Sequence, residues 1–312
     1  MSLWHVIIYW SKKMLSNKRV LVTGGCGFIG QILSNFLAEN NDVIVVDKVS
    51  ASLALNSSIQ LVNKDLTNLE DVSSLFKHVD VVFHLAADIS IRYCIENPNK
   101  SLYNNTVLNN NVLECCRVNN VKRMIFSSTA AVYKQKFVDK LYAETDELDP
   151  LNPYSASKAY GENLCRIYWN LYGIETVSLR YFNVYGNSKI TSSYSSVLNN
   201  FLYNVRNNKK LSINGDGHQT RDFIHVDDVV RANILAASAQ LETYGEVFNI
   251  GSGKAVTILD VANSISKNIE HAPQPAGELR FSQAKIQKAN DTLKWSPQHN
   301  LFEWLKKESA VM

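Results

Sequence analysis

The chain has 312 residues, of which 46% are hydrophobic and 20% charged, with a formal net charge of +3. These proportions are typical of a globular protein with a large core, and so small a charge, with scattered basic residues, argues against a nucleic-acid or membrane surface. The five cysteines show no C-x-x-C or Cys/His ligand spacing, so they indicate neither a disulfide framework nor a zinc site. We therefore predict no metal and a reducing, cytoplasmic location.

The first 16 residues are interpreted as an N-terminal extension. Residues 3–10 (LWHVIIYW) are apolar but too short to span a bilayer, and the residues that follow offer no small-residue cleavage site. We expect a disordered arm or a segment that docks on another surface, and no membrane span.

A nucleotide-binding pattern begins after this extension. Residues 18–23 (KRVLVT) predict a strand, and Gly25, Gly27 and Gly30 fit G-x-G-x-x-G before a helical pattern. In this pattern the glycines let the backbone approach a pyrophosphate that sits on the N-terminus of the following helix. The match predicts a dinucleotide-binding turn.

An acidic residue follows at the expected distance. Residues 42–47 predict a second strand that ends at Asp47, about 20 residues after the glycines, where a carboxylate accepts hydrogen bonds from ribose hydroxyls. Such a carboxylate repels a 2′-phosphate. The spacing therefore predicts NAD rather than NADP, although Lys48 next to it weakens this choice.

Strand and helix patterns then alternate to about residue 127. Repeated βαβ units predict a parallel sheet with helices on both faces, in which the ligand lies beyond the carboxyl ends of the strands. The expected strands are 59–62, 79–85 and 123–127, and the expected helices are 69–76 and a long one that ends near 119.

Two segments lie at predicted strand ends. Residues 84–87 (HLAA) are small enough to let a cofactor ring approach, but plain helix packing explains them equally well. Residues 127–133 (SSTAAVY) form a hydroxyl cluster that either serves the site or caps a helix.

Pro153 is expected to open a helix that carries Tyr154 and Lys158 one turn apart on the same face. A tyrosine has a pKa of about 10, so it becomes a useful base only beside a fixed positive charge. The pair alone is more typical of an ordinary amphipathic helix. With Thr129 at a neighbouring strand end, we predict that all three residues face one crevice.

The second half of the chain has a looser pattern. We expect a strand at 176–180, a Ser/Asn-rich loop at 187–196, a helix to about 206, a turn at 214–218, a strand from Arg221 into a capped helix, a strand at 247–250, a helix at 257–268 and two final helices. We predict a Rossmann domain over 17–180 and a smaller α/β substrate-binding domain over 181–312, with part of 220–250 crossing back.

Together these motifs resemble the extended short-chain dehydrogenase/reductase family, in its NAD-dependent nucleotide-sugar epimerase/dehydratase branch. The resemblance runs from about Lys18 to Trp304. It rests on TGGCGFIG at 23–30, Asp47, DL at 65–66, HLAA at 84–87, Asn105, SST at 127–129, Tyr154 with Lys158, RYFN at 180–183, Gly186, Gly215 with Gly217, and RDFIHV at 221–226.

The resemblance implies a Rossmann-type doubly wound fold and hydride chemistry on a sugar ring. Tyr154 takes the proton of the C4 hydroxyl, Lys158 lowers the tyrosine pKa, and Thr129 binds the reacting oxygen. The implied NAD-binding residues are Gly24, Gly27, Phe28, Ile29, Gly30, Asp47, Asp65, Leu66, Leu85, Ala86, Ala87, Asn105, Tyr154 and Lys158. The implied substrate-binding residues are Asn183, Arg221, Arg280 and Ser282.

Departures from the family pattern narrow the implied reaction. Dehydratases of the family place an acidic pair after the catalytic threonine, where this chain has Ala130 and Ala131. We therefore expect a UDP-sugar 4-epimerase acting by transient oxidation at C4. The alternatives are a 4-keto nucleotide-sugar reductase and a non-catalytic NAD-binding protein. Ser282 favours a UDP-N-acetylhexosamine over a plain UDP-hexose, and the family suggests a homodimer.

Overall fold

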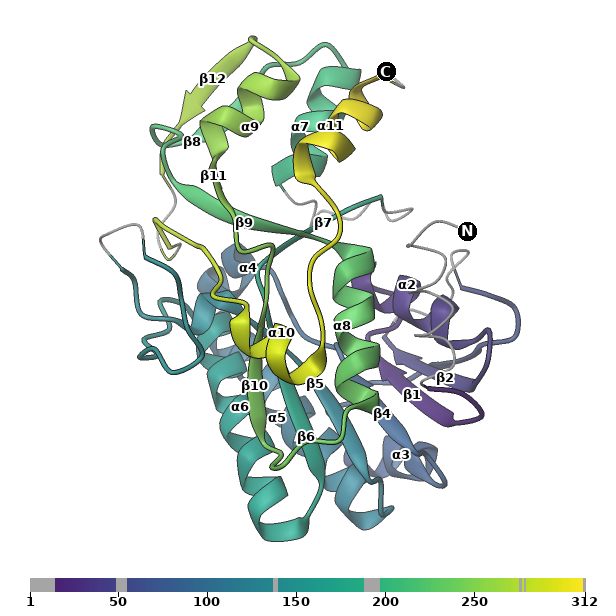
Figure 1. Cartoon of the computed structure of the whole chain (residues 1–312). Coiled ribbons are helices and arrows are strands. Elements are labelled where there is room, and N and C mark those ends of the chain that lie inside the picture. Colours follow the sequence, from purple (N-terminus) through teal and green to yellow (C-terminus); the bar gives the residue numbers. More distant parts are fainter. Residues whose placement is uncertain are drawn as a thin grey trace.

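A computed structural model describes residues 15–48, 55–136, 140–187, 197–274, 277 and 279–310. Most of the predicted extension and most of the predicted loop at 187–196 lie outside these ranges. A large lobe built on one sheet carries a smaller lobe at one end, the upper end in Figure 1.

The large lobe is built on a seven-stranded sheet in the order β10-β6-β5-β4-β1-β2-β3. Every neighbouring pair is parallel, which confirms the predicted doubly wound α/β fold. The strands are β1 (Arg19–Thr23), β2 (Asp42–Asp47), β3 (Gln60–Asn63), β4 (Val81–His84), β5 (Arg123–Thr129), β6 (Glu175–Tyr181) and β10 (Glu246–Ile250).

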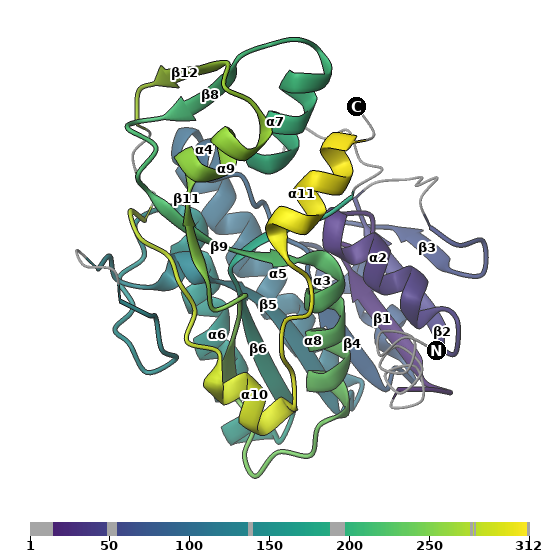
Figure 2. The same ribbon diagram turned by 45° about the horizontal axis from the view of Figure 1, so that its top comes forward.

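Helices cover both faces of this sheet, so alternate strand residues enter two different cores. Val20 and Val22 pack with one set of helices, whereas Leu21 between them packs with the other. The first face carries α2 (Phe28–Leu37), α8 (Val226–Ser238) and α10 (Gln287–Leu293), and the second carries α3 (Leu69–Ser73), the 3-10 turn Ser74–Phe76, α5 (Pro98–Val118) and α6 (Pro153–Tyr172), as Figure 2 shows from a second direction.

The long helix predicted up to residue 119 is two helices, so that prediction is wrong at one point. A short helix, α4 (Ile91–Glu96), ends at Asn97, and α5 starts at Pro98. Proline lacks the backbone N–H and disfavours the helical conformation of the residue before it. Asn97 accordingly has φ −131° and ψ 58°.

The smaller lobe has a core of its own around Phe201, Ile213 and Val261. The helix predicted at 257–268 ends at Ile265, because the next residue, Ser266, has an extended backbone with φ −156° and ψ 151°. Its elements are β7 (Asn183–Tyr185), β9 (Thr220–His225) and β11 (Ala255–Thr257) in one sheet, β8 (Leu211–Asn214) and β12 (Ile269–Ala272) in another, and the helices α7 (Val197–Arg206), α9 (Ile258–Ile265) and α11 (Leu301–Ala310).

Candidate functional site

The strand order of the large sheet places the candidate site where β1 and β4 lie side by side. Strand order runs outward from β1 through β2 and β3 on one side and through β4 and β5 on the other. The helices that follow β1 and β4 therefore leave toward opposite faces, and a crevice opens at the carboxyl ends of these strands. Thr23 and His84 are paired at this edge.

The glycine turn after β1 is packed too tightly for side chains. Gly24 has φ +69°, and a Cβ there would lie 2.7 Å from the amide nitrogen of Ala86. A Cβ on Gly30 would lie 2.2 Å from the carbonyl oxygen of Gly24. At Gly27 the nearest atom to an added Cβ is the Gly24 carbonyl oxygen, at 3.2 Å, and this residue is exposed. The turn therefore presents bare backbone to a ligand.

Helix α2 begins at this turn and presents an anion-binding end. Its N-cap residue is Gly27, which has no side chain to cap the first backbone N–H groups, and no acidic residue lies in the first turn. Half-buried Phe28 and Ile29 form that turn. Backbone N–H groups and the helix dipole therefore favour a phosphate at this position.

Asp47 lies beside the same turn. Its carboxylate accepts a hydrogen bond of 2.9 Å from the backbone N–H of Cys26, so it stands at the end of β2 next to the glycines. Lys48, the next residue, forms an ion pair with Asp65 at 3.9 Å. The glycine turn, the uncapped helix end and this carboxylate together fit a dinucleotide.

The other residues implied for NAD binding differ in how exposed they are. Asp65 is exposed and bonds to the backbone and hydroxyl of Thr67, whereas Leu66 is buried. Leu85, Ala86 and Ala87 are half-buried just past β4.

Asn105 is held entirely by the protein. Its amide bonds to the backbone N–H of Asp88 at 2.8 Å, to the Asp88 carbonyl at 3.1 Å and to the hydroxyl of Ser157 at 3.1 Å. The side chain thus fixes the segment after β4 against α6. Its role as a direct cofactor ligand stays a prediction.

The start of α6 is strongly defined by its sequence. Asn152 accepts a hydrogen bond of 2.9 Å from the backbone N–H of Ser155, the Ser155 hydroxyl bonds back to Asn152, and Pro153 occupies the first turn. This capping box and the proline fix the position of the first turn. Tyr154 therefore has a rigid support.

Thr129, Tyr154 and Lys158 come together as the sequence pattern indicates. Thr129 ends β5, and its hydroxyl is close enough to the Tyr154 phenol to lower the pKa of that group. The Lys158 ammonium nitrogen lies 6.0 Å from the centre of the Tyr154 ring and donates to the Ser127 carbonyl at 2.7 Å. Lys158 itself is only 1% exposed.

The electrostatics differ from the expectation that Lys158 lowers the tyrosine pKa. Burial raises the pKa of Tyr154 to about 12, and the hydrogen bond with Thr129 only partly opposes this. Burial also lowers the pKa of Lys158 to about 7. The physical reason is that desolvation disfavours the charged form of both groups. The protein alone therefore does not stabilise the phenolate form of Tyr154.

Glu162 belongs to the same site and escaped the sequence interpretation. Buried one turn after Lys158, it binds the Arg180 guanidinium through both carboxylate oxygens, at 2.8 and 2.7 Å, and accepts a hydrogen bond of 2.5 Å from Ser128. The i, i+4 spacing from Lys158 places it on the same helix face. That spacing is the pattern that could have identified it.

The residues implied for the substrate gather around β9. Asn183 on β7 pairs with Phe223, and half-buried Arg221 on β9 donates to the carbonyl of Thr220 at 2.9 Å. The backbone carbonyl of Arg280 accepts from Thr220 at 3.1 Å, so the segment containing Arg280 and Ser282 runs beside β9.

Two of these residues have other partners than the sequence suggested. The Arg280 guanidinium is bound by both carboxylate oxygens of Asp216, at 2.9 and 2.7 Å. Ser282 is buried, and its backbone N–H lies 3.4 Å from the Thr220 hydroxyl.

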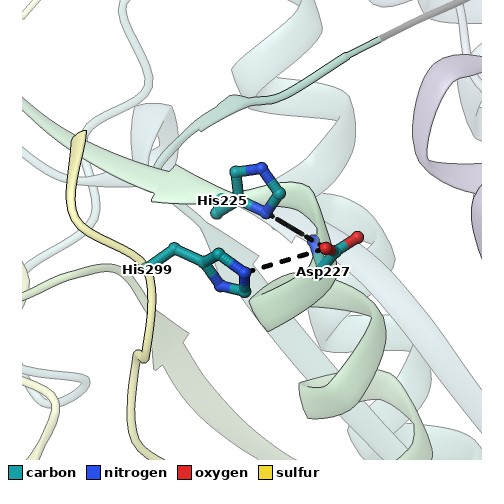
Figure 3. Close-up of side chains that lie close together, drawn as sticks. All are labelled: His225, Asp227 and His299. Atoms are coloured by element: carbon teal, nitrogen blue, oxygen red, sulfur yellow. Dashed lines mark hydrogen bonds and ion pairs between the residues drawn. The ribbon is translucent and has the colours of Figure 1, made fainter. Parts of the chain in front are cut away.

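A histidine and aspartate group lies beyond β9, where α8 meets the C-terminal segment (Figure 3). His225 Nδ1 and His299 Nε2 lie 3.6 and 3.8 Å from one oxygen of Asp227. The two rings, however, are stacked with centres 4.2 Å apart and planes only 19° apart. A metal ion must lie close to the plane of each imidazole that binds it, and near-parallel planes do not meet beside Asp227. We interpret the group as a structural clamp, in which His225 Nδ1 accepts from the Asp227 backbone N–H at 3.2 Å and His299 Nδ1 bonds to the Asp228 carboxylate at 3.0 Å.

In the described part of the chain, every helix is too short or too polar to cross a bilayer. A family model described as the NAD dependent epimerase/dehydratase family matches residues 20–251.

Three solved structures are similar over nearly the whole chain. A UDP-N-acetylglucosamine 4-epimerase from Methanobrevibacter ruminantium, in complex with UDP-N-acetylmuramic acid, is 32% identical with a TM-score of 0.87, over 95% of this chain and 98% of that one. A Thermotoga maritima UDP-glucose 4-epimerase with UDP-glucose is 32% identical, TM-score 0.88, over 94% and 97%. A Bacillus cereus UDP-glucuronic acid 4-epimerase with UDP-glucuronic acid and NAD is 32% identical, TM-score 0.85, over 94% and 98%.

Proposed function

Because the chain belongs to the NAD-dependent epimerase/dehydratase family and is an NAD-dependent epimerase, we propose that it inverts C4 of a UDP-linked hexose by transient oxidation at that carbon. The observation that carries the proposal is the meeting of Thr129, Tyr154 and Lys158 beside two alanines, Ala130 and Ala131. A proton acceptor is present, and neither alanine can serve as the additional acid or base that dehydration requires.

Tyr154 moves the proton in this proposal. Its oxygen accepts the proton of the C4 hydroxyl, while the neighbouring Thr129 hydroxyl holds the reacting oxygen. NAD, when bound, would supply hydride exchange at either face of C4 and a positive charge that favours the phenolate form of a nearby tyrosine. Lys158 adds positive charge whenever it is protonated. The net reaction is thus redox-neutral.

The nucleotide end of the substrate is assigned to β9 and its neighbours. Arg221 is suited to the diphosphate because a guanidinium binds phosphate oxygens in pairs, and Asn183 lies on the adjacent strand. Arg280 is held by Asp216 through two of its nitrogen atoms. Arg221 is assigned as the main diphosphate ligand in the proposal because its strand pairs with the strand that carries Asn183.

The test is turnover without any added cofactor. The purified protein is incubated with UDP-glucose, UDP-galactose, UDP-N-acetylglucosamine, UDP-N-acetylgalactosamine and UDP-glucuronic acid, and C4 epimers are followed by NMR. Conversion of at least one sugar supports the proposal, and the fastest one identifies the substrate. A protein that converts none of them, but consumes one NADH per 4-keto sugar, is a reductase and the proposal is wrong.

A further inference from the structure

His84 ends β4 at the edge where β1 and β4 meet, and its buried ring has a polar partner on each side. The Nδ1 atom lies 2.7 Å from the Thr23 hydroxyl oxygen, and Nε2 lies 2.9 Å from the side-chain oxygen of Asn109 on α5. Burial, together with the charge of Lys158, lowers the pKa of the ring to about 3. His84 is therefore neutral, with one hydrogen to donate.

The direction of each hydrogen bond follows from the chemistry of the partners. The Asn109 amide nitrogen points at the Ser157 carbonyl, at a long 3.5 Å, so its oxygen faces His84 and can only accept. The hydrogen of His84 is thus on Nε2, and Nδ1 accepts from the Thr23 hydroxyl. The Thr23 oxygen in turn accepts from the Ala86 backbone N–H at 3.3 Å.

The result is a chain of donors that all point the same way, from Ala86 through Thr23, His84 and Asn109 to Ser157. Bonds aligned in this manner polarise and strengthen one another in a buried setting. Protonation of His84 would remove the acceptor that Thr23 needs, so the chain exists only with a neutral ring.

The two ends of this chain lie at the two halves of the site. Ala86 packs directly on Gly24 of the glycine turn, where an added Cβ would come within 2.7 Å of its amide nitrogen. Ser157 precedes Lys158, and its hydroxyl donates to the Tyr154 carbonyl at 2.7 Å. The chain therefore joins the cofactor side of the crevice to the catalytic turn of α6.

We propose that His84 is a positioning residue, whose neutral ring sets the separation between the glycine turn and the catalytic turn that carries Tyr154 and Lys158. The proposal rests on the function proposed above. It gives His84 no contact with substrate or cofactor. Because a misplacement of 1 Å near the chemistry costs about 100-fold in rate, a link of this kind acts on kcat.

The test uses three replacements that divide the ring's two bonds. His84→Gln keeps a donor near the Nε2 position for Asn109, His84→Asn keeps an acceptor near the Nδ1 position for Thr23, and His84→Leu keeps neither. Val82→Ala is the matched control, since Val82 is buried on the same strand and points to the same face but bonds to nothing in the chain. For each holoenzyme, kcat, KM and the unfolding temperature are measured.

We expect His84→Leu to lose at least about 10-fold in kcat with KM unchanged within about two-fold, and His84→Gln to retain more activity than His84→Asn, because it keeps the bond toward the catalytic turn. Val82→Ala is expected to lower the unfolding temperature without a comparable loss of kcat. Equal kcat for His84→Leu and the wild type overturns the proposal. The proposal is also overturned if Val82→Ala loses as much kcat as His84→Leu for the same loss of unfolding temperature.

A second measurement separates this proposal from the proposed function. Amide hydrogen exchange of residues 155–158 is compared in the NAD-bound proteins, and it needs no turnover. Exchange at least about 10-fold faster in His84→Leu than in Val82→Ala supports the link even if no UDP-sugar is epimerised. If His84→Leu does not fold, the ranking of His84→Gln over His84→Asn in the same exchange measurement decides, and an equal or reversed ranking overturns the proposal.

Discussion

Tyr154 is the proton acceptor in the proposed mechanism, yet its surroundings favour the protonated phenol. Burial raises its pKa to about 12, and burial also lowers the pKa of Lys158 to about 7, so the ammonium is only partly charged at neutral pH. A deprotonated Tyr154 therefore requires positive charge from a bound ligand.

Replacing Tyr154 by phenylalanine removes the proton acceptor while leaving the ring in place. We expect kcat to fall by about 10²- to 10⁴-fold, the usual contribution of general acid–base catalysis, with NAD still bound. The checks are kcat by NMR and NAD content by absorbance after denaturation. Tyr160→Phe, on the exposed side of the same helix, is the control and should keep full activity. Full activity in Tyr154→Phe removes this residue from its role.

Lys158→Met tests the buried ammonium through stability. A lysine whose folded pKa is lowered from 10.5 to about 7 destabilises the fold fully below pH 7, and this cost disappears as the pH rises toward 10.5. The NAD-free variant should therefore unfold at a higher temperature than the wild type at pH 6, with a smaller difference at pH 10. Thermal unfolding at both pH values measures this. A difference that does not change with pH contradicts a lowered lysine pKa.

At the scale of elements, the N-terminus of α8 holds the C-terminal segment. The buried Asp228 carboxylate accepts from the backbone N–H groups of Gln298 and His299, each at 3.0 Å, and from His299 Nδ1 at 3.0 Å. The Trp295 ring nitrogen donates to the Asp228 carbonyl at 2.9 Å. Helix α11 is thereby anchored to the same helix that packs on the large sheet.

His299→Gln tests this clamp. The hydrogen bond with Asp228 raises the pKa of His299, so the stabilisation is fully present below about pH 6.5 and is lost as the pH rises through the folded pKa. We expect the variant to lose about 1.5 kcal/mol of unfolding free energy at pH 6 and less at pH 9. Urea unfolding at the two pH values measures it, with exposed His271→Gln as the control. A loss that is larger at pH 9 would falsify the assignment.

Local sequence patterns predicted the elements well where they are governed by nearby residues. The glycine spacing, the strand ending at Asp47 and the helix opened by Pro153 all depend on short-range chemistry, and each element lies where the pattern indicates. The break at Pro98 was also visible in the sequence, since a proline inside a helical pattern interrupts it, and it should have been predicted.

Contacts between distant segments were not predictable in this way. The sequence pattern indicates only that His84 ends a strand, and nothing nearby in sequence indicates Thr23 or Asn109 as its partners. The pairing of Arg280 with Asp216 joins residues 64 positions apart. Likewise, the tyrosine pKa depends on how deeply the whole fold buries the phenol, which spacing along one helix does not determine.

At the scale of the whole molecule, α5 and α6 lie side by side and expose an unusual number of large apolar side chains. On these two helices Tyr103, Val118, Tyr160, Ile167, Leu171 and Tyr172 are all exposed. Exposed apolar side chains gathered on two neighbouring helices often mark an interface. We propose that a second copy of the chain covers it, which gives a homodimer.

A charged substitution on this surface should separate the copies. We expect the wild type to have the mass of a dimer in solution and the double variant Ile167→Glu with Leu171→Glu to have the mass of a monomer, because four carboxylates cannot be buried together in an apolar interface. Light scattering after size-exclusion chromatography measures both. Phe302→Glu, on exposed α11, is the control and should remain dimeric. A monomeric wild type contradicts the proposal.

The position of β10 matters for how the protein is made. This strand completes the edge of the large sheet beside β6, yet more than 60 residues of the smaller lobe and α8 separate the two in the chain. During synthesis the ribosome therefore releases β6 long before its edge partner exists, and an unpaired parallel edge is prone to pair with other chains. A nascent chain stopped after β6 is the form of this protein on which we expect a chaperone to act.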